Sequence, residues 1–238
     1  MIKNQNSTMK TILVTGASKG IGFETSLSLS ESGHKVIATA RSADKLKVLK
    51  EKANSDLIHI ISADITTESG IDSIKALISQ VGNIDALINN AGMVLNKPFM
   101  ETSKEEWKSI FDVNLIAPVL LIKNLKSFFN KNAHIVNIGS MGGFQGSDKF
   151  PGLSAYSTTK GALAIFSESL SAEFSSEGIA VNCLCLGAVQ TEMLAKAFPG
   201  FKAPVTPKEM GKYISEFCLT GHHFMNGKVI PVSLNNPE

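Results

Sequence analysis

The stretch TILVTGASKGIG at residues 11–22 decides how the rest of this sequence is interpreted. Its first five residues are apolar or β-branched and predict a buried strand, and a helical pattern begins directly after the stretch. Gly16 permits a tight turn, Gly20 lets a diphosphate approach the backbone, and Gly22 lets the helix pack closely on the strand. A glycine cluster alone could be an ordinary turn, but this one, between a strand and a helix, predicts a dinucleotide site.

Six more apolar segments of strand length follow, with helical patterns between them. They are residues 35–38, 57–61, 84–88, 134–138, 179–184 and 228–232. Continuous apolar strands that alternate with helices are typical of a parallel sheet covered on both faces, because each parallel connection needs a crossover helix. We therefore expect a single-domain α/β protein with a doubly wound Rossmann fold, a seven-stranded parallel sheet, and a ligand crevice beyond the carboxyl ends of the strands.

Two of the intervening segments predict long helices, over about residues 103–129 and about residues 154–177. Pro118 should kink or interrupt the first of them, because proline lacks the N–H that a helix interior needs. The stretch 192–206, rich in Ala, Pro, Gly and Phe, follows the sixth strand. Its position at the carboxyl end of a strand makes it a candidate substrate lid.

The composition excludes several classes of protein. The 238 residues are 43% hydrophobic and 18% charged, with 23 basic and 21 acidic side chains, so the chain carries no strong overall field. Nucleic acid and membrane are therefore poor partners, and no apolar run approaches the roughly 20 residues of a spanning helix. We expect a cytoplasmic protein with a flexible polar leader at residues 1–9 and one domain over residues 10–238.

The cysteines and histidines show no metal-binding or redox pattern. Cys183 and Cys185 lie two apart, which on a strand places both side chains on one face, so we expect buried reduced thiols. His222 and His223 are adjacent and have no ligand partner at metal spacing, so we expect solvated loop residues and no metal.

The end of the second strand predicts which cofactor is bound. An acidic residue at this point would grip the ribose hydroxyls of NAD, but the chain has Arg41 there and Lys19 in the glycine turn. Two cations near the 2′ position favour the extra phosphate of NADP(H) through charge-assisted hydrogen bonds. The alternative is that both are ordinary solvated surface charges.

Further motifs follow the glycine turn in a consistent order. They are Asp64 after the third strand, NNAG at 89–92, Asn114 in VNL, Ser140 in IGS and YSTTK at 156–160. With them the sequence resembles the short-chain dehydrogenase/reductase family over about residues 10–232. The resemblance implies a catalytic set of Asn114, Ser140, Tyr156 and Lys160. The cofactor contacts predicted from the turn and implied by the resemblance are Gly16, Ser18, Lys19, Gly20, Ile21, Gly22, Arg41, Asp64, Ile65, Asn90, Tyr156, Lys160, Val189 and Thr191.

The residues support the same chemistry directly. Tyr156 and Lys160 lie four apart in a helical segment, so they share a face, and the ammonium should lower the phenol pKa. Ser140 ends a strand at the crevice, where its hydroxyl can bind the oxygen that gains negative charge. Considered alone, however, Tyr156 and Lys160 could be an ordinary pair on a helix surface. Ser140 could be a cap at the end of a strand. The resemblance implies that Asn114 orders a water that relays protons to the lysine. Considered alone, Asn114 could be a buried hydrogen-bond partner. Asp64 could likewise be a cap for the helix near Thr67.

Three departures from the family pattern bear on the substrate. Leu186 stands where the family usually has proline, which should loosen the turn beside the cofactor. The segment 141–155 is longer than in many relatives, and the end of the chain lacks a glycine-rich finish.

The leading hypothesis is an NADP-dependent oxidoreductase acting on a small carbonyl or alcohol substrate. The resemblance implies a homotetramer or homodimer and makes a 3-oxoacyl-carrier-protein reductase the best-known branch. The alternative is a catalytically silent NADP-binding regulator or scaffold, because a fold does not fix a function.

Overall fold

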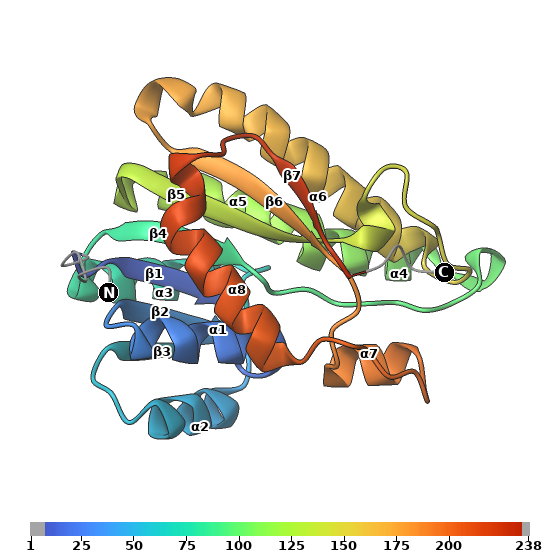
Figure 1. The fold of residues 1–238 in the computed structure, drawn as a ribbon, viewed down its shortest axis with the longest axis horizontal. Coiled ribbons are helices and arrows are strands. Elements are labelled where there is room, and N and C mark those ends of the chain that lie inside the picture. The colour runs from blue at the N-terminus through green and yellow to red at the C-terminus, as the bar shows by residue number, and fades with distance from the viewer. Residues whose placement is uncertain (1–7, 235–238) are drawn as a thin grey trace.

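The computed structural model describes residues 8–234, which form one parallel sheet with helices on both faces (Figure 1). The strands are β1 (Thr11–Thr15), β2 (Lys35–Ala40), β3 (Ile58–Ser62), β4 (Ile84–Asn89), β5 (Phe129–Ser140), β6 (Ala180–Leu186) and β7 (Val229–Val232). Their order in the sheet is β3-β2-β1-β4-β5-β6-β7, and every pair is parallel. The predicted doubly wound fold is therefore confirmed. Of the predicted leader, residues 1–7 lie outside the described residues.

Two layers of helices cover the sheet. One contains α1 (Gly20–Glu31), α2 (Ala43–Ala53) and α8 (Pro207–Thr220), and the other contains α3 (Glu68–Val81), α4 (Lys104–Phe111), α5 (Ala117–Leu125) and α6 (Ser154–Glu173). In Figure 1, α8 crosses in front of the strands beside α1. Along β1, Ile12 and Val14 pack into the first layer and Leu13 into the second, because successive side chains of a strand alternate. No helix within residues 8–234 is long and apolar enough to cross a bilayer.

The predicted helix over residues 103–129 is interrupted close to Pro118, as expected. After α4 the chain makes one π-helical turn over residues 112–116, and α5 then begins at Ala117. Pro118 cannot donate an N–H to the carbonyl of Asn114, so the regular α-helical ladder cannot run through this point. The interruption lies one turn before the proline, and Asn114 is part of it.

The boundaries of β5 and α6 also differ from the sequence-based ranges. β5 begins at Phe129, which pairs with Ile84 of β4, so the helix predicted to reach residue 129 ends earlier. The second long helix, α6, ends at Glu173 and is followed by a 3-10 turn over residues 175–177.

The expectation that His222 is solvated is wrong. His222 lies in a 3-10 turn after α8 and is half-buried, with its ring centroid 5.1 Å from that of His134. His134 is buried on β5 and also packs against Phe217. Burial lowers the pKa of both His134 and His222 to about 4, so both are neutral at pH 7. His223 is exposed, as expected.

The two neighbouring cysteines lie where their spacing predicted. Cys183 and Cys185 are buried, unbridged, on the same face of β6, in a small cluster with Met141 and Ala164. This cluster lies against the part of α6 that carries Lys160, which makes the thiols part of the packing around that side chain.

Candidate active site

A cavity of about 840 Å³ lies along the carboxyl ends of the strands. Most of its walls are the loops that follow β1 to β6, and α8 and the end of β7 complete them. The predicted site residues that line it are Gly16, Ser18, Lys19, Gly20, Ile21, Arg41, Asp64, Ile65, Asn90, Ser140, Tyr156, Lys160, Val189 and Thr191. Gly22 and Asn114 do not line it and act from behind its wall. The structure thus gathers the residues from distant parts of the chain around one space.

The glycine turn meets the requirements of a diphosphate site. Gly16 and Gly20 have positive φ values of 68° and 59°, which glycine adopts without strain. A Cβ on Gly20 would have only Thr191 within 4 Å, at 3.5 Å, so the backbone here borders open space. No side chain caps the amino terminus of α1, so the first-turn N–H groups are left for a bound anion. The residues present fit a dinucleotide.

The loop after β4 braces this turn. The Nδ2 of Asn90 donates hydrogen bonds to the carbonyls of Thr15 and Gly16, and the backbone N–H groups of Asn90 and Ala91 both donate to Thr15 Oγ1. A Cβ on Gly22 would lie 2.4 Å from Asn90 Nδ2 and 2.6 Å from the Gly16 carbonyl oxygen. Gly22 therefore serves close packing, as predicted, and the Asn90 amide is used to hold the turn.

Arg41, Asp64 and Lys45 line the end of the cavity over β2 and β3. Hydrogen bonds from Thr66 lower the pKa of the Asp64 carboxyl, and the nearby Arg41 guanidinium contributes a smaller lowering. The hydroxyl of Thr67, not Asp64, caps α3. Lys45, in the first turn of α2, was missed by the sequence analysis, although its place four residues after Arg41 at a helix start was a usable signal.

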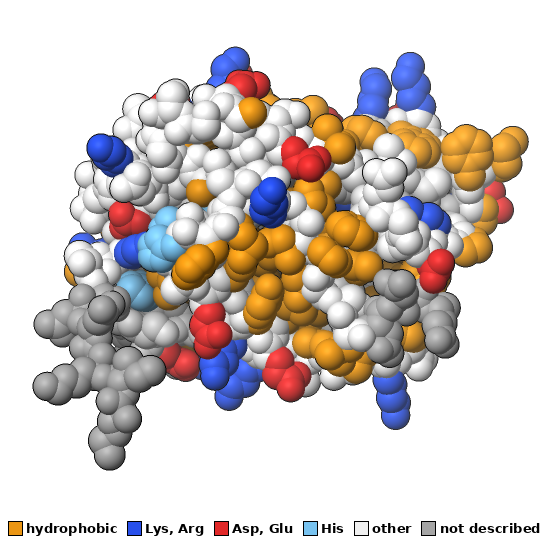
Figure 2. All heavy atoms as spheres, turned by 45° about the horizontal axis from the view of Figure 1, so that its top comes forward, with side chains coloured by type: hydrophobic (Ala, Val, Ile, Leu, Met, Phe, Trp, Pro, Cys, Tyr) orange, Lys and Arg blue, Asp and Glu red, His pale blue; other side chains and the backbone are white. Residues whose placement is uncertain are grey.

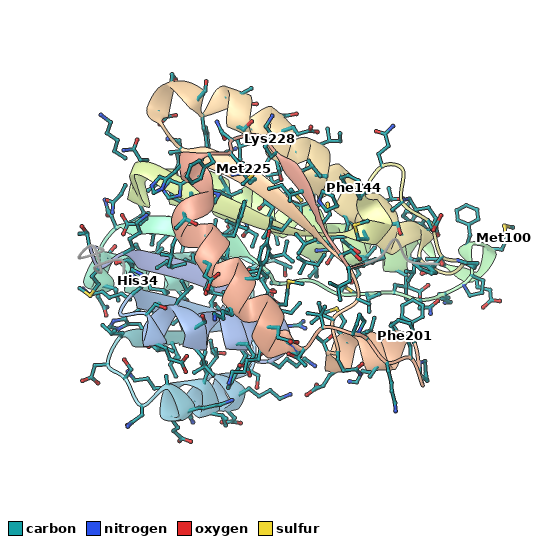
Figure 3. All side chains as sticks on the ribbon, in the orientation of Figure 1. His34, Met100, Phe144, Phe201, Met225 and Lys228 are labelled. Atoms are coloured by element: carbon teal, nitrogen blue, oxygen red, sulfur yellow. The ribbon has the colours of Figure 1, made fainter. Side chains whose placement is uncertain are left out.

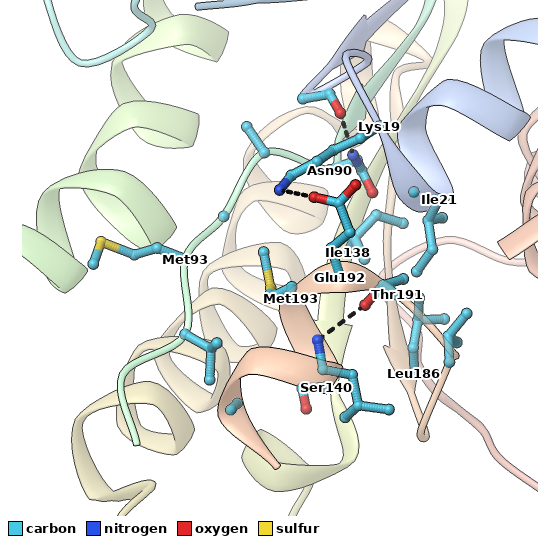
Figure 4. Close-up of a pocket in the computed structure, with 18 of the residues that line it drawn as sticks. Lys19, Ile21, Asn90, Met93, Ile138, Ser140, Leu186, Thr191, Glu192 and Met193 are labelled. Atoms are coloured by element: carbon cyan, nitrogen blue, oxygen red, sulfur yellow. Dashed lines mark hydrogen bonds and ion pairs between the residues drawn. The ribbon is translucent and has the colours of Figure 1, made fainter. Parts of the chain in front are cut away.

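Lys19 is paired with a residue of the stretch 192–206. Its Nζ lies 2.7 Å from Oε2 of Glu192, the first residue of α7 (Glu192–Ala197), and this ion pair spans the mouth of the cavity (Figure 4). The hydrogen bond from Lys19 lowers the pKa of Glu192. The composition of residues 192–206 did not indicate a helix, but α7 forms there and is capped by Thr191, whose Oγ1 accepts a hydrogen bond from the Leu194 N–H. The hydroxyl of Thr191 is thus occupied as a cap.

The predicted catalytic side chains meet where β5 and α6 approach each other. Ser140 is the last residue of β5, and its Oγ accepts a hydrogen bond from the Gly142 N–H. Tyr156 lies in the first turn of α6, and Lys160 lies one turn later with Nζ 6.0 Å from the Tyr156 ring centroid. Lys160 is only 4% exposed, and its Nζ donates a 2.7 Å hydrogen bond to the carbonyl of Ile138.

The pKa of Tyr156 shifts in the opposite direction to the one expected. Burial raises it, and the hydrogen bond with Ser140 is the main opposing effect. The Lys160 ammonium does not offset burial, because its Nζ lies 6.0 Å from the Tyr156 ring centroid and donates to the Ile138 carbonyl. Burial also lowers the pKa of Lys160 to about 8. At pH 7 the phenol is therefore protonated and Lys160 is still mostly charged.

Asn114 holds a loop in place instead of facing the cavity. Its Oδ1 accepts from the Met93 N–H, and its Nδ2 donates to the Met93 carbonyl and to Thr159 Oγ1. The side chain is fully buried, and every one of these bonds joins the π-helical turn to the loop after β4 or to α6. Its side chain thus matches the buried hydrogen-bond partner that the sequence left open as an alternative.

The turn after β6 is more regular than Leu186 suggested. Leu186 is the final residue of β6, pairs with Val232 and packs into the core. The next residue, Gly187, donates its N–H to the Val232 carbonyl at 2.9 Å, so the ladder continues past Leu186. The donor is Gly187 itself, so this bond does not depend on which residue stands at 186, and with Leu186 the start of the turn stays tied to β7.

Similarity to known proteins agrees with this geometry. Residues 10–200 match the model of the family described as short chain dehydrogenase. The chain belongs to the short-chain dehydrogenase family. It is therefore an oxidoreductase by family, and the resemblance stated from its motifs is confirmed.

Relatives of this short-chain dehydrogenase span most of its length. An uncharacterized oxidoreductase of Staphylococcus saprophyticus is 35% identical over 190 residues, which cover 77% of this chain and 76% of the relative. Among solved structures, a 3-ketoacyl-(acyl-carrier-protein) reductase from Brucella melitensis complexed with NADH has a TM-score of 0.85 and 26% identity, covering 94% of this chain and 96% of that one. A short-chain dehydrogenase/reductase (glucose/ribitol dehydrogenase) of the same organism has a TM-score of 0.87 and 25% identity, covering 96% and 97%.

The burial of Lys160 in this short-chain dehydrogenase predicts that the residue destabilises the fold. Replacing Lys160 with Met should increase the free energy of unfolding at pH 7 by about 1–3 kcal/mol, because a buried charge is removed while the Ile138 carbonyl loses its partner. The pKa is lowered in the folded state, so between pH 8 and 10.5 the unfolded chain binds more protons and the wild type regains stability. The advantage of the variant should shrink over that window.

Urea unfolding at several pH values measures this. Lys47→Met, at an exposed site on α2, is the matched control and should change stability little at any pH. A Lys160→Met variant that is less stable than wild type at pH 7 would contradict the prediction.

Proposed function

We propose that this short-chain dehydrogenase prefers NADP(H) and transfers hydride between the nicotinamide and a carbonyl or alcohol substrate, with Tyr156 as general acid/base. The observation that carries the proposal is the meeting of Ser140, Tyr156 and Lys160 on the wall of the cavity that the glycine turn also lines. Cofactor and reacting groups would then share one space, as hydride transfer requires.

Each residue has a definite task in this scheme. When bound, NADPH would supply the hydride to the carbonyl carbon. The Ser140 hydroxyl would donate to the substrate oxygen, and Tyr156 would give it a proton. The raised pKa of Tyr156 favours the protonated donor form, which suits carbonyl reduction at neutral pH. Lys160 would supply positive charge beside the phenolate that forms, and Asn114 would keep the loop at Met93 in position.

Three cations support the preference for NADP(H). Arg41, Lys45 and Lys19 line the cavity around the point where the adenosine ribose of a dinucleotide would lie, and the acidic residue typical of NAD sites is replaced by Arg41. Lys19 would reach a phosphate only if its ion pair with Glu192 opened.

The cofactor proposal is tested by two substitutions with opposite effects. Arg41→Ala should weaken NADPH binding about tenfold, because a charge-assisted hydrogen bond to the 2′-phosphate is lost. Glu192→Gln should strengthen NADPH binding by up to about fivefold, because Lys19 is released from an exposed pair. Fluorescence titration of NADPH gives the dissociation constants, with NADH as the control ligand that neither change should affect much. Tighter binding of NADH than of NADPH by the wild type would refute the preference.

The acid/base role of Tyr156 is tested by Tyr156→Phe, which keeps the ring and removes the hydroxyl. We expect kcat to fall by about 10²–10⁴ with ketone, quinone or acyl-thioester substrates, while NADPH binding and thermal stability change little. NADPH oxidation followed by absorbance measures the rate. Near-normal turnover by a folded variant would refute the role. If the wild type binds NADPH but reduces no carbonyl on this panel, the alternative of a silent NADP-binding regulator is favoured.

A 3-oxoacyl-carrier-protein reductase remains the leading named branch of the proposal. Its support is the similarity to the Brucella melitensis reductase of that name. An acidic carrier would need a basic docking surface at the cavity mouth, and the lid contributes only Lys196 and Lys202 to one. The acyl-thioester arm of the panel addresses the branch directly.

We also propose that the protein forms a homodimer or homotetramer. Ile116 and Leu120 at α5 and Ile165 on α6 are exposed apolar side chains on the long helices. Figure 2 shows a second gathering of apolar side chains, on the face that carries α8 and β7, where Tyr213 and Phe224 are exposed. Such surfaces favour self-association. Sedimentation at micromolar concentration should give two or four copies, and a monomer would contradict the proposal.

A further inference from the structure

The cavity is divided into a charged half and an apolar half along the sheet. The charged side chains Lys19, Arg41, Lys45 and Asp64 belong to the loops and helix starts after β1, β2 and β3. Glu192 comes from the lid but pairs with Lys19, so it belongs to the same half. This half is where the phosphates and adenosine of the proposed cofactor would lie.

The other half lies over β4, β5 and β6 and surrounds Tyr156. Among the described residues that these loops contribute to the cavity wall, the ionisable ones besides Glu192 are Tyr156 and Lys160. Lys160 lines this half, and its Nζ already donates a hydrogen bond to the Ile138 carbonyl. The apolar lining residues of this half include Val94, Met141, Phe150, Leu153, Met193, Leu194, Ala197, Phe198, Phe201 and Pro204.

Three loops close over this half. The rings of Phe150, in the loop before α6, and Phe198, at the end of α7, meet edge to face with centroids 6.3 Å apart. The Nδ2 of Asn96 donates to the Ala197 carbonyl at 2.7 Å, which ties the β4 loop to the lid. The Lys97 N–H donates to the carbonyl of Gly152, which ties it to the Phe150 loop. Figure 3 shows Phe201 beside α7, and Figure 4 shows Met193 among the pocket residues drawn.

An anionic substrate group would lose hydration here, and the cation available among the described residues of this half, Lys160, already donates to the Ile138 carbonyl. An alkyl or aryl group would instead be removed from water against Phe150, Leu153 and Phe198. We infer that the substrate is an uncharged ketone or aldehyde with an apolar alkyl or aryl group beside the carbonyl. This inference rests on the proposed reductase function and adds to it the class of compound that reaches Tyr156.

The first test compares two compounds that differ in one charge. With NADPH, the kcat/KM for ethyl 3-oxobutanoate should exceed that for 3-oxobutanoate by at least about 100-fold, because an unpaired carboxylate is excluded. In addition, 4-phenylbutan-2-one should be reduced at least about tenfold more efficiently than butan-2-one, because its ring adds apolar contact area. Equal or higher efficiency with the 3-oxobutanoate anion overturns this inference alone. No turnover with any compound here or on the earlier panel overturns the proposed function, and this inference with it.

A pair of substitutions locates the effect in the lid. Met193 is 38% exposed and lines the cavity, so Met193→Arg places a cation there without filling a buried site. We expect it to lower the preference for ester over acid by at least about tenfold. Met100→Arg makes the same change at a side chain that is 88% exposed and points outward, away from the cavity, and should leave the preference as in wild type (Figure 3). An unchanged preference in Met193→Arg, or an equal change in both variants, overturns the assignment of this half to the substrate.

Discussion

The contact between the glycine turn and the loop after β4 is the constraint on which the rest of the site depends. Thr15 Oγ1 accepts two backbone N–H groups from that loop, and Asn90 returns two hydrogen bonds to the turn. β1 and β4 are neighbours at the point where the strand order reverses, which is where an open α/β sheet leaves a crevice. The hydrogen bonds hold the glycine turn and the loop after β4 so close together that a Cβ at position 16 or 22 would clash. Only glycine fits at these two positions.

The side chains that line the cavity change from charged to apolar along the sheet. The loops over β1 to β3 carry the cations, and the loops over β4 to β6 carry aromatic and aliphatic side chains. Lys160 belongs to the second region and is buried beside the thiols of Cys183 and Cys185. A charge in such a place opposes folding, and its position beside Tyr156 accounts for why the fold would keep it.

The sequence predicted the features that local patterns control. These features depend on residues that are close together in the chain, so periodicity and spacing reveal them. They are the positions of the strands along the sequence, the glycine turn, and the shared helix face of Tyr156 and Lys160. The features it missed depend on tertiary partners. The π-helical turn is joined to a distant loop through Asn114, His222 is buried by His134, and Lys19 meets Glu192 across the cavity.

The sign of the Tyr156 shift shows the same limit. Sequence spacing places Lys160 on the correct face, but the balance between its field and desolvation depends on where Nζ points and how deeply the ring lies. Neither quantity has a signature in a single sequence. The helix in the lid was hidden for another reason: at six residues, α7 is too short to show a periodic pattern.

That short helix is tied at its two ends to different parts of the cavity wall. Its first residue pairs with Lys19 in the charged half, and its last residue accepts a hydrogen bond from Asn96 beside the apolar half. A displacement of α7 would therefore alter the charged and the apolar half of the cavity together.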